Sequence, residues 1–503
     1  MPAISIKRTI HACCPSVFKP TLARIEASEI GYRLAKGAFW SLFGAVVSRL
    51  LGLVSFVIVA RVLGKAGYGQ FGIIQSTVGM FGVFAGFGLG QTATKYVAEL
   101  RDKDPVRAGR IMGMAGLVAI GTGLLMAGVL FSFAPWLASR TLADASLTPL
   151  LRVGALILVL EAMNGAQVGA LSGFEAFKTI AKINAGVGLA SFPMMVVGVY
   201  FGDLEGSVWA LAVNRAFNWL LNHLALRREA SRAGVPFSWR GSNEELGVLW
   251  RFSLPSMLAG VMVTPTLWIC NTLLVNQPGG YEQMGILQAS RLFQQALMFM
   301  GATLGAPMLP MLANIISSGG DNERFGRINM LLTWFLGAFP ALLLISLPEV
   351  GQAVFGKQFI GQDFTNTYLL MLFSTSIIIY KQGLARALSA HGLMWWGMCS
   401  NLFWAIIMII STRFLISWGA PGYSAAWTCA YIVNTIVFIP LYTHKGLVPI
   451  GTIVSFKAGL IWLCLIVAVT LNFLDASIVL RLIFLPVAAV TMFWMFFKLL
   501  TNK

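Results

Sequence analysis

Apolar segments long enough to cross a bilayer follow one another from about residue 36 to the end of the chain. A helix needs about 20 such residues to span the hydrocarbon core, and helices and closed barrels are the only folds that satisfy their backbone there. The pattern therefore predicts an all-α polytopic membrane protein with about 14 transmembrane helices. The expected spans are 36–60, 69–92, 109–133, 148–171, 180–201, 206–226, 251–276, 283–306, 327–348, 365–388, 397–418, 422–443, 450–472 and 478–498.

A short internal repeat divides these spans into two sets. Residues 67–76 read GYGQFGIIQS and residues 280–289 read GYEQMGILQA, in the second and eighth expected spans. An even number of spans separates the copies, so both run the same way through the membrane, and an axis along the membrane normal would relate them. The alternative is a chance match between glycine-rich apolar segments. We expect two pseudo-symmetric six-helix lobes.

The same pattern sets the expected domain boundaries. They are a cytoplasmic tail at 1–35, a first lobe at 36–226, a linker at 227–250, a second lobe at 251–444, and two extra spans with the C-terminus at 445–503. The tail is basic and lacks the apolar run of a signal peptide. The linker is the longest internal hydrophilic stretch and carries a candidate capped helix start at residues 242–245.

The distribution of charge predicts the orientation of the chain in the membrane. The chain is 57% hydrophobic and 11% charged, with a formal net charge of +17. In a soluble protein this excess would favour a nucleic-acid partner. Here most lysines and arginines, Lys381 and Arg386 among them, are assigned to loops on one side, which predicts that both termini are cytoplasmic and that no nucleic acid is bound. Four of the six cysteines lie in apolar spans, so no disulfide framework is expected.

Motifs for enzymatic chemistry are missing from the sequence, which contains no HExxH, GxSxG, Walker A or CxxC pattern. The outer loops are also too short for a catalytic domain. We therefore expect no catalytic residues, metal or cofactor, and no ATP-driven pump within this chain. Transport would draw on an ion gradient, the membrane potential or the substrate gradient.

Six arginines fall within the expected spans. An arginine at the bilayer centre costs about 2.5–3.5 kcal/mol on insertion scales, so each is a candidate functional residue. Three lie near the outer ends of their spans and are expected to snorkel to the interface: Arg152, Arg413 and Arg481. The deeper three are expected to face the space between the lobes, unless they form structural ion pairs or bind backbone carbonyls: Arg49, Arg215 and Arg291.

Polar residues add to this candidate cavity. Gln288, Arg291 and Gln295 share one helical face because they are spaced i, i+3 and i+7. Glu161 is the one carboxylate placed plainly within the membrane, either as a proton or cation site or as the structural partner of a deep arginine. Several arginines against one acid predict a cationic cavity that attracts a multiply anionic ligand, such as a phosphate or pyrophosphate.

Three N-terminal motifs resemble a known signature. They are SRLLG at 48–52, ARVLGKAGYG at 60–69 and the GLG to KYVAE stretch at 88–99. They are similar to bacterial polysaccharide biosynthesis flippases of the multidrug/oligosaccharidyl-lipid/polysaccharide exporter superfamily. The resemblance implies two lobes in a V shape, alternating access and a central cationic cavity. The implied substrate is an undecaprenyl-diphosphate-linked oligosaccharide, moved from the cytoplasmic to the periplasmic leaflet of the inner membrane.

The resemblance extends to single residues. Arg49 matches the first-span arginine of related lipid II flippases, and Arg291 resembles an eighth-span arginine proposed to contact the pyrophosphate. Those flippases often carry a further Arg-Asp pair where this chain has Val54 and Ser55, which favours an O-antigen or exopolysaccharide unit over a peptidoglycan precursor. The extra spans would cradle the polyprenyl tail. Together with the polar face and the deep arginines, the expected substrate contacts are Arg49, Arg215, Arg291, Gln288 and Gln295. Glu161 is expected either to bind a coupling H+ or Na+ or to hold an arginine in place.

Three alternative functions fit part of the sequence. A multidrug or organic-cation antiporter of the same superfamily would need more acidic groups in its cavity. A membrane glycan polymerase or ligase would need a large outer loop. A scaffold that transports nothing is a third alternative. If the chain is a flippase, the bilayer, a glycan polymerase and a chain-length regulator are its expected partners.

Overall fold

The computed structural model describes residues 29–501, except residues 240, 255–256, 259–260, 306–307, 309–311, 313–321, 392, 448–451 and 453–454. Helices make up nearly all of this part of the chain, and no strand occurs within it. Nine helices among the described residues are long and apolar enough to cross a membrane, and several of them contain two of the expected spans. The all-α prediction is confirmed.

The first long helix, α3 (Glu29–Gly86), doubles back on itself. Its backbone leaves the helical region at Gly64, where φ is 70° and ψ is −176°. This left-handed φ favours glycine, which has no Cβ to clash. The rings of Phe56 and Phe71 lie on either side of the bend with centroids 6.3 Å apart. In a straight helix these residues would be separated by about 22 Å, so α3 is a hairpin that covers the first two expected spans.

The helix α7 (Phe177–Arg232) is a second hairpin, bent at Gly202 and Asp203. Its two arms touch through Gly198 and Gly206. A Cβ placed on Gly206 would lie 2.0 Å from the carbonyl oxygen of Gly198. The arms approach this closely because both positions lack a side chain, and the hairpin covers the fifth and sixth expected spans.

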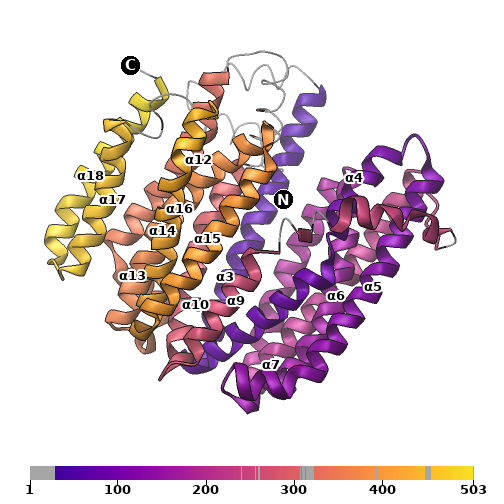
Figure 1. The fold of residues 1–503 in the computed structure, drawn as a ribbon, viewed down its shortest axis with the longest axis horizontal. Helices are drawn as coiled ribbons and strands as arrows, with labels where there is room; N and C mark the ends of the chain where they lie inside the picture. The colour runs from indigo at the N-terminus through magenta and orange to yellow at the C-terminus, as the bar shows by residue number, and fades with distance from the viewer. Residues whose placement is uncertain are drawn as a thin grey trace, which may run out of the picture.

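The helices form two groups that lie side by side in Figure 1. The first group holds α3, α4 (Leu89–Leu100), α5 (Pro105–Trp136), α6 (Thr148–Gly173) and α7. The second group holds α9 (Val263–Val275), α10 (Gly280–Gly305), α12 (Asn322–Ser346), α13 (Pro348–Phe355), α14 (Gln362–Ala390), α15 (Met394–Leu415) and α16 (Gly419–His444). At its edge lie α17 (Phe456–Phe473) and α18 (Ile478–Thr501), which pack along α12.

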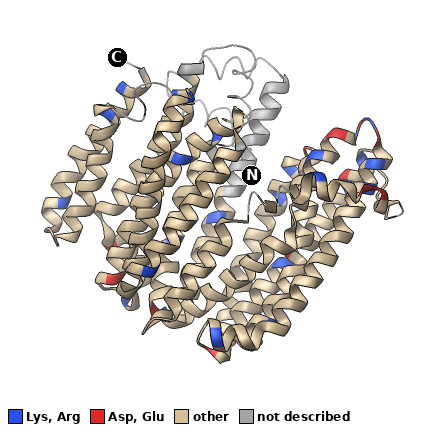
Figure 2. Ribbon diagram, in the orientation of Figure 1, with Lys and Arg blue, Asp and Glu red and all other residues tan. Residues whose placement is uncertain are grey.

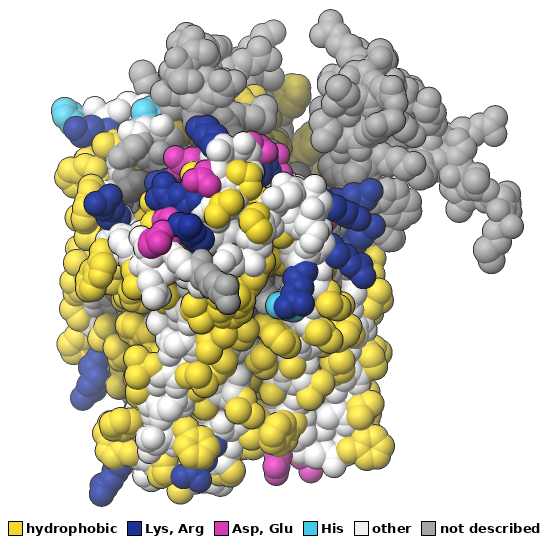
Figure 3. Space-filling view, turned by 90° about the vertical axis from the view of Figure 1, so that its right-hand side faces the viewer, with side chains coloured by type: hydrophobic (Ala, Val, Ile, Leu, Met, Phe, Trp, Pro, Cys, Tyr) yellow, Lys and Arg dark blue, Asp and Glu magenta, His cyan; other side chains and the backbone are white. Residues whose placement is uncertain are grey.

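Most charged residues lie toward the ends of the helices, with a few part-way along them (Figure 2). The face in Figure 3 carries a broad band of hydrophobic side chains beneath a zone rich in Lys and Arg. Two further positive charges within the bundle were not expected there. Lys381 and Arg386, which the sequence analysis assigned to a loop, lie within α14. That assignment was wrong, because α14 continues to Ala390 and carries both side chains inside the helix bundle.

The expected span 251–276 is not one helix. A π-helical turn at Leu249–Ser253 and α9 are separate elements. The turn packs on α4, where the Ser253 and Thr92 hydroxyls lie 2.7 Å apart and the rings of Phe252 and Tyr96 meet edge to face. The helix α9 instead packs against α3, α10 and α15. The start of this segment therefore packs on α4, and its end packs on α3, α10 and α15.

The two copies of the internal repeat cross each other, since one lies on α3 and the other on α10. A Cβ on Gly69 would lie 1.9 Å from the carbonyl oxygen of Tyr281, and one on Gly285 would lie 2.0 Å from that of Lys65. No side chain fits at these distances, so the glycines of the repeat bring the two backbones into direct contact.

Equivalent positions of the repeat also make equivalent bonds. Gln70 donates to Asp144 Oδ2 and Gln283 donates to Asp363 Oδ2, each over 2.8 Å. Asp144 directly precedes the short helix that leads into α6, and Asp363 lies in the first turn of α14. The repeat is thus matched by a repeated tertiary contact, which a chance similarity of sequence would not produce.

At the bend of α3 the two groups are tied together. The Arg61 guanidinium donates to the carbonyl oxygens of Ala353 and Val354, each over 2.9 Å. The Tyr281 hydroxyl donates to the Leu142 carbonyl over 2.6 Å. This is the end that the sequence analysis assigns to the periplasm, and the cavity described below lies between the groups at greater depth.

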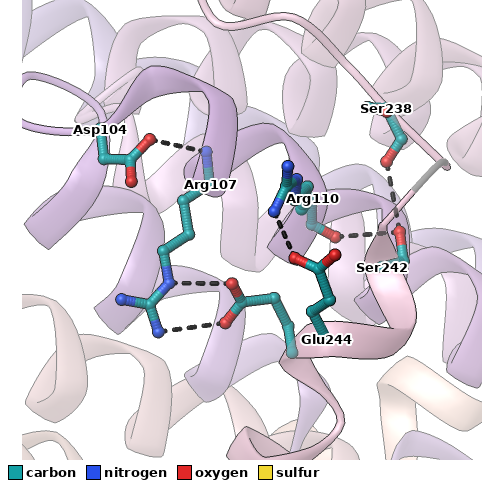
Figure 4. Close-up of polar contacts among 7 residues, drawn as sticks. Asp104, Arg107, Arg110, Ser238, Ser242 and Glu244 are labelled. Carbon is teal, nitrogen blue, oxygen red and sulfur yellow. Dashed lines mark hydrogen bonds and ion pairs between the residues drawn. The ribbon is translucent and has the colours of Figure 1, made fainter.

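The linker folds back onto α5 (Figure 4). Arg107 donates to both carboxylate oxygens of Glu245, over 2.8 and 3.1 Å, and Arg110 pairs with Glu244. The expected capped helix start is instead a 3₁₀ turn at Ser242–Glu245, in which Ser242 makes no cap. Its hydroxyl donates to backbone carbonyls, that of Arg110 among them, because the turn is held by α5.

The crossing of the repeats predicts a difference between two glycines of α3. Gly69→Ala should destabilise the protein by about 1–3 kcal/mol, because the methyl group would overlap the backbone of α10. Gly79→Ala, where nothing lies within 4 Å of the added Cβ, should be neutral or slightly stabilising through helix propensity. Denaturant unfolding of the detergent-purified variants measures both. Equal stability of the two variants would contradict the close crossing.

The linker contacts predict unequal effects of two adjacent substitutions. Glu245 is 7% exposed and bidentate, whereas Glu244 is 66% exposed. Glu245→Gln should therefore weaken the docked linker by about 1.5–3 kcal/mol, and Glu244→Gln by less than about 1 kcal/mol. Hydrogen exchange of residues 241–253 reports the docking directly. Protection lost equally in both variants, or in neither, would show that the Arg107 pair is not what holds the linker.

Candidate functional site

A cavity of about 390 Å³ lies between α3, α7 and α10. Two arginines reach it from different helices, Arg49 from α3 and Arg215 from α7. Six amide and hydroxyl side chains complete its polar lining: Ser48, Asn184, Ser191, Asn214, Asn218 and Gln295. No carboxylate belongs to the lining among the residues that the structure describes. The cavity is therefore cationic, and it is rich in groups that hydrogen-bond to phosphates and hydroxyls.

Arg49 is exposed to this cavity. Its Nη2 donates to Gln295 Oε1 over 3.3 Å, and its guanidinium carbon lies 6.0 Å from the centre of the Phe299 ring. In the described part of the chain no carboxylate lies within ion-pair distance of it. One weak hydrogen bond uses little of the five N–H donors that a guanidinium carries, so Arg49 can still bind an anion.

Arg215 has an acidic neighbour. Its Nε lies 3.2 Å from Glu161 Oε1, which comes from α6. The same nitrogen makes no hydrogen bond of ordinary geometry, so the contact is a Coulombic pair with poor alignment. The two side chains are 38% and 32% exposed. This partial exposure screens the pair, and the Glu161 carboxylate keeps lone pairs that a proton or a cation can use.

Arg291 and Gln288 do not line this cavity. The Arg291 Nη2 donates to the Tyr423 hydroxyl over 2.7 Å, and the guanidinium lies over the rings of Tyr423 and Trp427 on α16. Gln288 packs against Gly72, where α3 crosses α10. Of the polar face expected on α10, only Gln295 reaches the cavity. The convergence of Arg49 with Arg291 is therefore absent in this conformation, since Arg291 turns toward α16 instead.

The arginines near the expected outer ends behave differently from one another. Arg481 does not reach the interface alone, because it donates to Asn472 and pairs with Glu349. Arg152 lies over the Phe131 ring at 4.8 Å. Arg413 is exposed near the end of α15, as expected of a snorkelling side chain.

Sequence reasoning missed two cations inside α14. Arg386 donates three hydrogen bonds to α12, to the Asn329 side chain and backbone and to the Thr333 hydroxyl. Lys381 contacts the Asn434 side-chain oxygen and lies over the Tyr431 ring. Both residues lie within the expected span 365–388. The limits of that span therefore already placed them in a helix, although the charge count had assigned them to a loop.

Comparison with known proteins gives the family. A family model described as polysaccharide biosynthesis protein matches residues 34–315, which is more than half of the 503 residues. The chain belongs to the polysaccharide biosynthesis protein family. The resemblance inferred from the N-terminal motifs is thereby confirmed, and the match covers the cavity residues of α3, α7 and α10.

The chain aligns with two curated relatives over most of their length. The chain is 23% identical to the lipid III flippase of Escherichia coli (strain K12) over 415 residues, which make up 74% of this chain and 98% of that protein. It is 24% identical to the EPS I polysaccharide export inner membrane protein EpsE of Ralstonia nicotianae over 403 residues, covering 77% of this chain and 88% of the relative.

Solved structures show the same fold. The lipid II flippase MurJ in an inward closed conformation superposes with a TM-score of 0.71 and 12% identity, covering 91% of this chain and 98% of that one. An inward-facing multidrug resistance MATE family transporter of the MOP superfamily gives a TM-score of 0.58 at 13% identity, covering 82% and 98%. At these identities the likeness shows the fold alone.

The Glu161–Arg215 contact predicts a measurable coupling between the two residues. In a double-mutant cycle of Glu161→Gln and Arg215→Gln, we expect a coupling free energy of about 1 kcal/mol, because the pair is partly exposed and poorly aligned. Denaturant unfolding of the four proteins in detergent gives this value. A coupling near zero would mean that the two groups do not sense each other's charge.

Proposed function

We propose that this chain is an inner-membrane flippase that moves an undecaprenyl-diphosphate-linked oligosaccharide from the cytoplasmic to the periplasmic leaflet. The observation that carries the proposal is the cavity between the two helix groups, which Arg49 and Arg215 line and whose described lining contains no carboxylate. A diphosphate is a compact anion that guanidinium groups bind with paired, charge-assisted hydrogen bonds. The relatives' names, which describe flipping and export, support the same substrate class.

The amide and hydroxyl groups beside the arginines suit the sugar part of such a substrate. Asn184, Asn214, Asn218 and Gln295 offer both donors and acceptors, which is what a hydroxyl-rich glycan needs on leaving water. The lining therefore supports a glycolipid more than an apolar cation. Arg291 and Gln288 would join the contacts only in a state in which α10 and α16 have moved relative to each other.

We infer that the architecture is two six-helix lobes, at 36–226 and 251–444, with two further helices after residue 445 and about 14 spans in total. The repeated Gln70 and Gln283 contacts support the pairing of the lobes. The lobes would rock around the central cavity, exposing it to each side in turn. The excess of Lys and Arg at one end supports cytoplasmic termini.

Coupling to an ion gradient belongs to the same proposal. Glu161 borders the cavity through Arg215, and its partly exposed carboxylate could take up H+ or Na+. Protonating Glu161 would leave Arg215 unneutralised and raise the positive potential of the cavity. Binding of a diphosphate and binding of a proton would then favour each other.

The rival functions make different demands on the site. An organic-cation antiporter needs acidic groups in its cavity, whereas the described lining has two arginines. Resistance to organic cations conferred by the chain, without any effect on surface glycan, would support that rival. A polymerase or ligase would lengthen or transfer the glycan in a purified system, where a flippase leaves the product unchanged.

Transport by reconstituted protein tests the proposal. In proteoliposomes carrying a lipid-linked oligosaccharide, Arg49→Ala should lower the flipping rate about 10- to 100-fold, which corresponds to about 1.5–3 kcal/mol for a hydrogen bond to a charged group. Arg49→Lys should retain part of the rate because it keeps the charge. The matched control is Arg413→Ala, an exposed arginine outside the cavity, which should stay within about twofold of wild type.

Two further variants separate the roles of the deep arginines. Arg215→Ala should slow flipping and also remove the dependence on an ion gradient, since it deletes the partner of Glu161. Arg291→Ala tests the contact implied by the family resemblance. Wild-type flipping by Arg49→Ala would overturn the cationic-cavity mechanism, and wild-type flipping by Arg291→Ala would remove that residue from the substrate contacts.

A further inference from the structure

A second polar cavity lies inside the second helix group, apart from the one between the groups. Its volume is about 330 Å³, and its lining comes entirely from α14, α15 and α16. It shares no lining residue with the cavity of Arg49 and Arg215. Leu388, Ser389, Gly397 and Met398, near the turn between α14 and α15, form one part of the wall. The sequence analysis assigns that turn to the cytoplasmic side.

Lys381 is the charged group of this cavity. It projects from α14 and contacts the Asn434 side-chain oxygen, and its Nζ lies 5.7 Å from the centre of the Tyr431 ring. Asn434 is itself fully buried and is held by Ser400, whose backbone oxygen accepts from Asn434 Nδ2 over 2.8 Å. The lysine is thus directed by a fixed amide, and no carboxylate of the described chain lies within ion-pair distance of it.

An ammonium ion has three donors, and one amide oxygen and one ring face do not neutralise its charge. A cation held away from bulk water without a counter-charge is costly unless an anion joins it. The described lining around Lys381 contains no acid, and its polar groups are Gln382, Ser400, Asn401, Tyr431 and Tyr442. Ser400 and Gln382 already donate to Asn434 and Met298, which leaves Asn401 and the two tyrosines as neutral donors. The arrangement has the composition of an oxyanion site: one cation, several neutral donors and room for a small group.

We propose that this cavity binds an oxyanion, a phosphate or a carboxylate, with Lys381 as its main charged contact and Asn401 as a neutral one. The anion is carried either by a lipid headgroup that enters from the cytoplasmic leaflet or by a free solute, and the chemistry of recognition is the same for both. The site is independent of the proposed transport cavity, so it stands even if the flippase proposal fails.

Inorganic phosphate is the first probe. The thermal unfolding midpoint of the full-length protein in a neutral detergent is measured against phosphate at constant ionic strength. Wild type should show a saturable rise. Lys381→Gln should weaken the apparent phosphate affinity at least about tenfold, because a charged contact is lost, and Lys381→Arg should stay within about threefold. Asn401→Ala, an exposed residue that leaves the Lys381–Asn434 contact in place, should weaken the affinity by a smaller factor.

Arg413→Gln serves as the matched control, since it removes an exposed arginine that lines neither cavity, and it should leave the phosphate titration unchanged. Arg49→Gln is measured in parallel, because phosphate can also bind in the cavity between the helix groups, and the part of the response that depends on Lys381 should persist in it. If the response is lost in Arg49→Gln and kept in Lys381→Gln, the anion binds in the cavity between the helix groups and the proposal is overturned. It is also overturned if wild type shows no saturable response, or if Lys381→Gln and Asn401→Ala both respond like wild type.

Native mass spectrometry distinguishes the two sources. Wild type and Lys381→Gln are compared after exposure to phosphatidylglycerol or phosphatidylcholine. Fewer bound phosphatidylglycerol molecules in the variant, with phosphatidylcholine unchanged, would identify a lipid headgroup as the ligand. Equal lipid retention together with the loss of phosphate affinity would identify a free anion, and either result supports the site. Equal retention with no loss of phosphate affinity would refute it.

Discussion

A guanidinium group within a membrane needs polar or charged partners, and most arginines inside the helix bundle have them. Arg386 has three hydrogen bonds to α12 and Arg481 has an acid and an amide. Arg291 has a hydroxyl and two aromatic rings. Arg49 differs from all of them, because it makes one 3.3 Å contact to an amide and otherwise faces a cavity. The functional reading rests on this contrast between satisfied and unsatisfied donors.

The sequence predicted the features that depend on local composition and on repetition. Membrane-length apolar runs gave the helices, and the paired motifs at 67–76 and 280–289 marked the place where α3 and α10 meet. Of the three deep arginines, Arg49 and Arg215 line one cavity and Arg291 does not. Few environments in a membrane accept a charge, so composition alone restricts where these side chains point.

The features that sequence reasoning missed depend on the rotation of helices and on distant partners. Arg291 and Gln295 are four residues apart on one face, yet the first turns to Tyr423 and the second to Arg49. That choice follows from where α16 packs, which periodicity along α10 cannot reveal. The pairing of Arg107 with Glu245 was hidden for a similar reason, since 138 residues separate them and both belong to surface segments.

The linker joins the first helix group to the second and is itself packed on the first. Glu244 and Glu245 pair with arginines of α5. The turn at Leu249–Ser253 contacts α4 through Ser253, so the linker is attached to the first helix group up to this residue. The helix α9 begins at Val263 and packs on α3 as well as on α10, α15 and α16. At the opposite end, Arg61 and Tyr281 tie the groups together. The contacts at this end and the contacts of the linker thus lie at opposite ends of the helix groups. The turn at residues 261–262 directly precedes α9, and residues at the end of a helix absorb changes in backbone angle more readily than residues inside one.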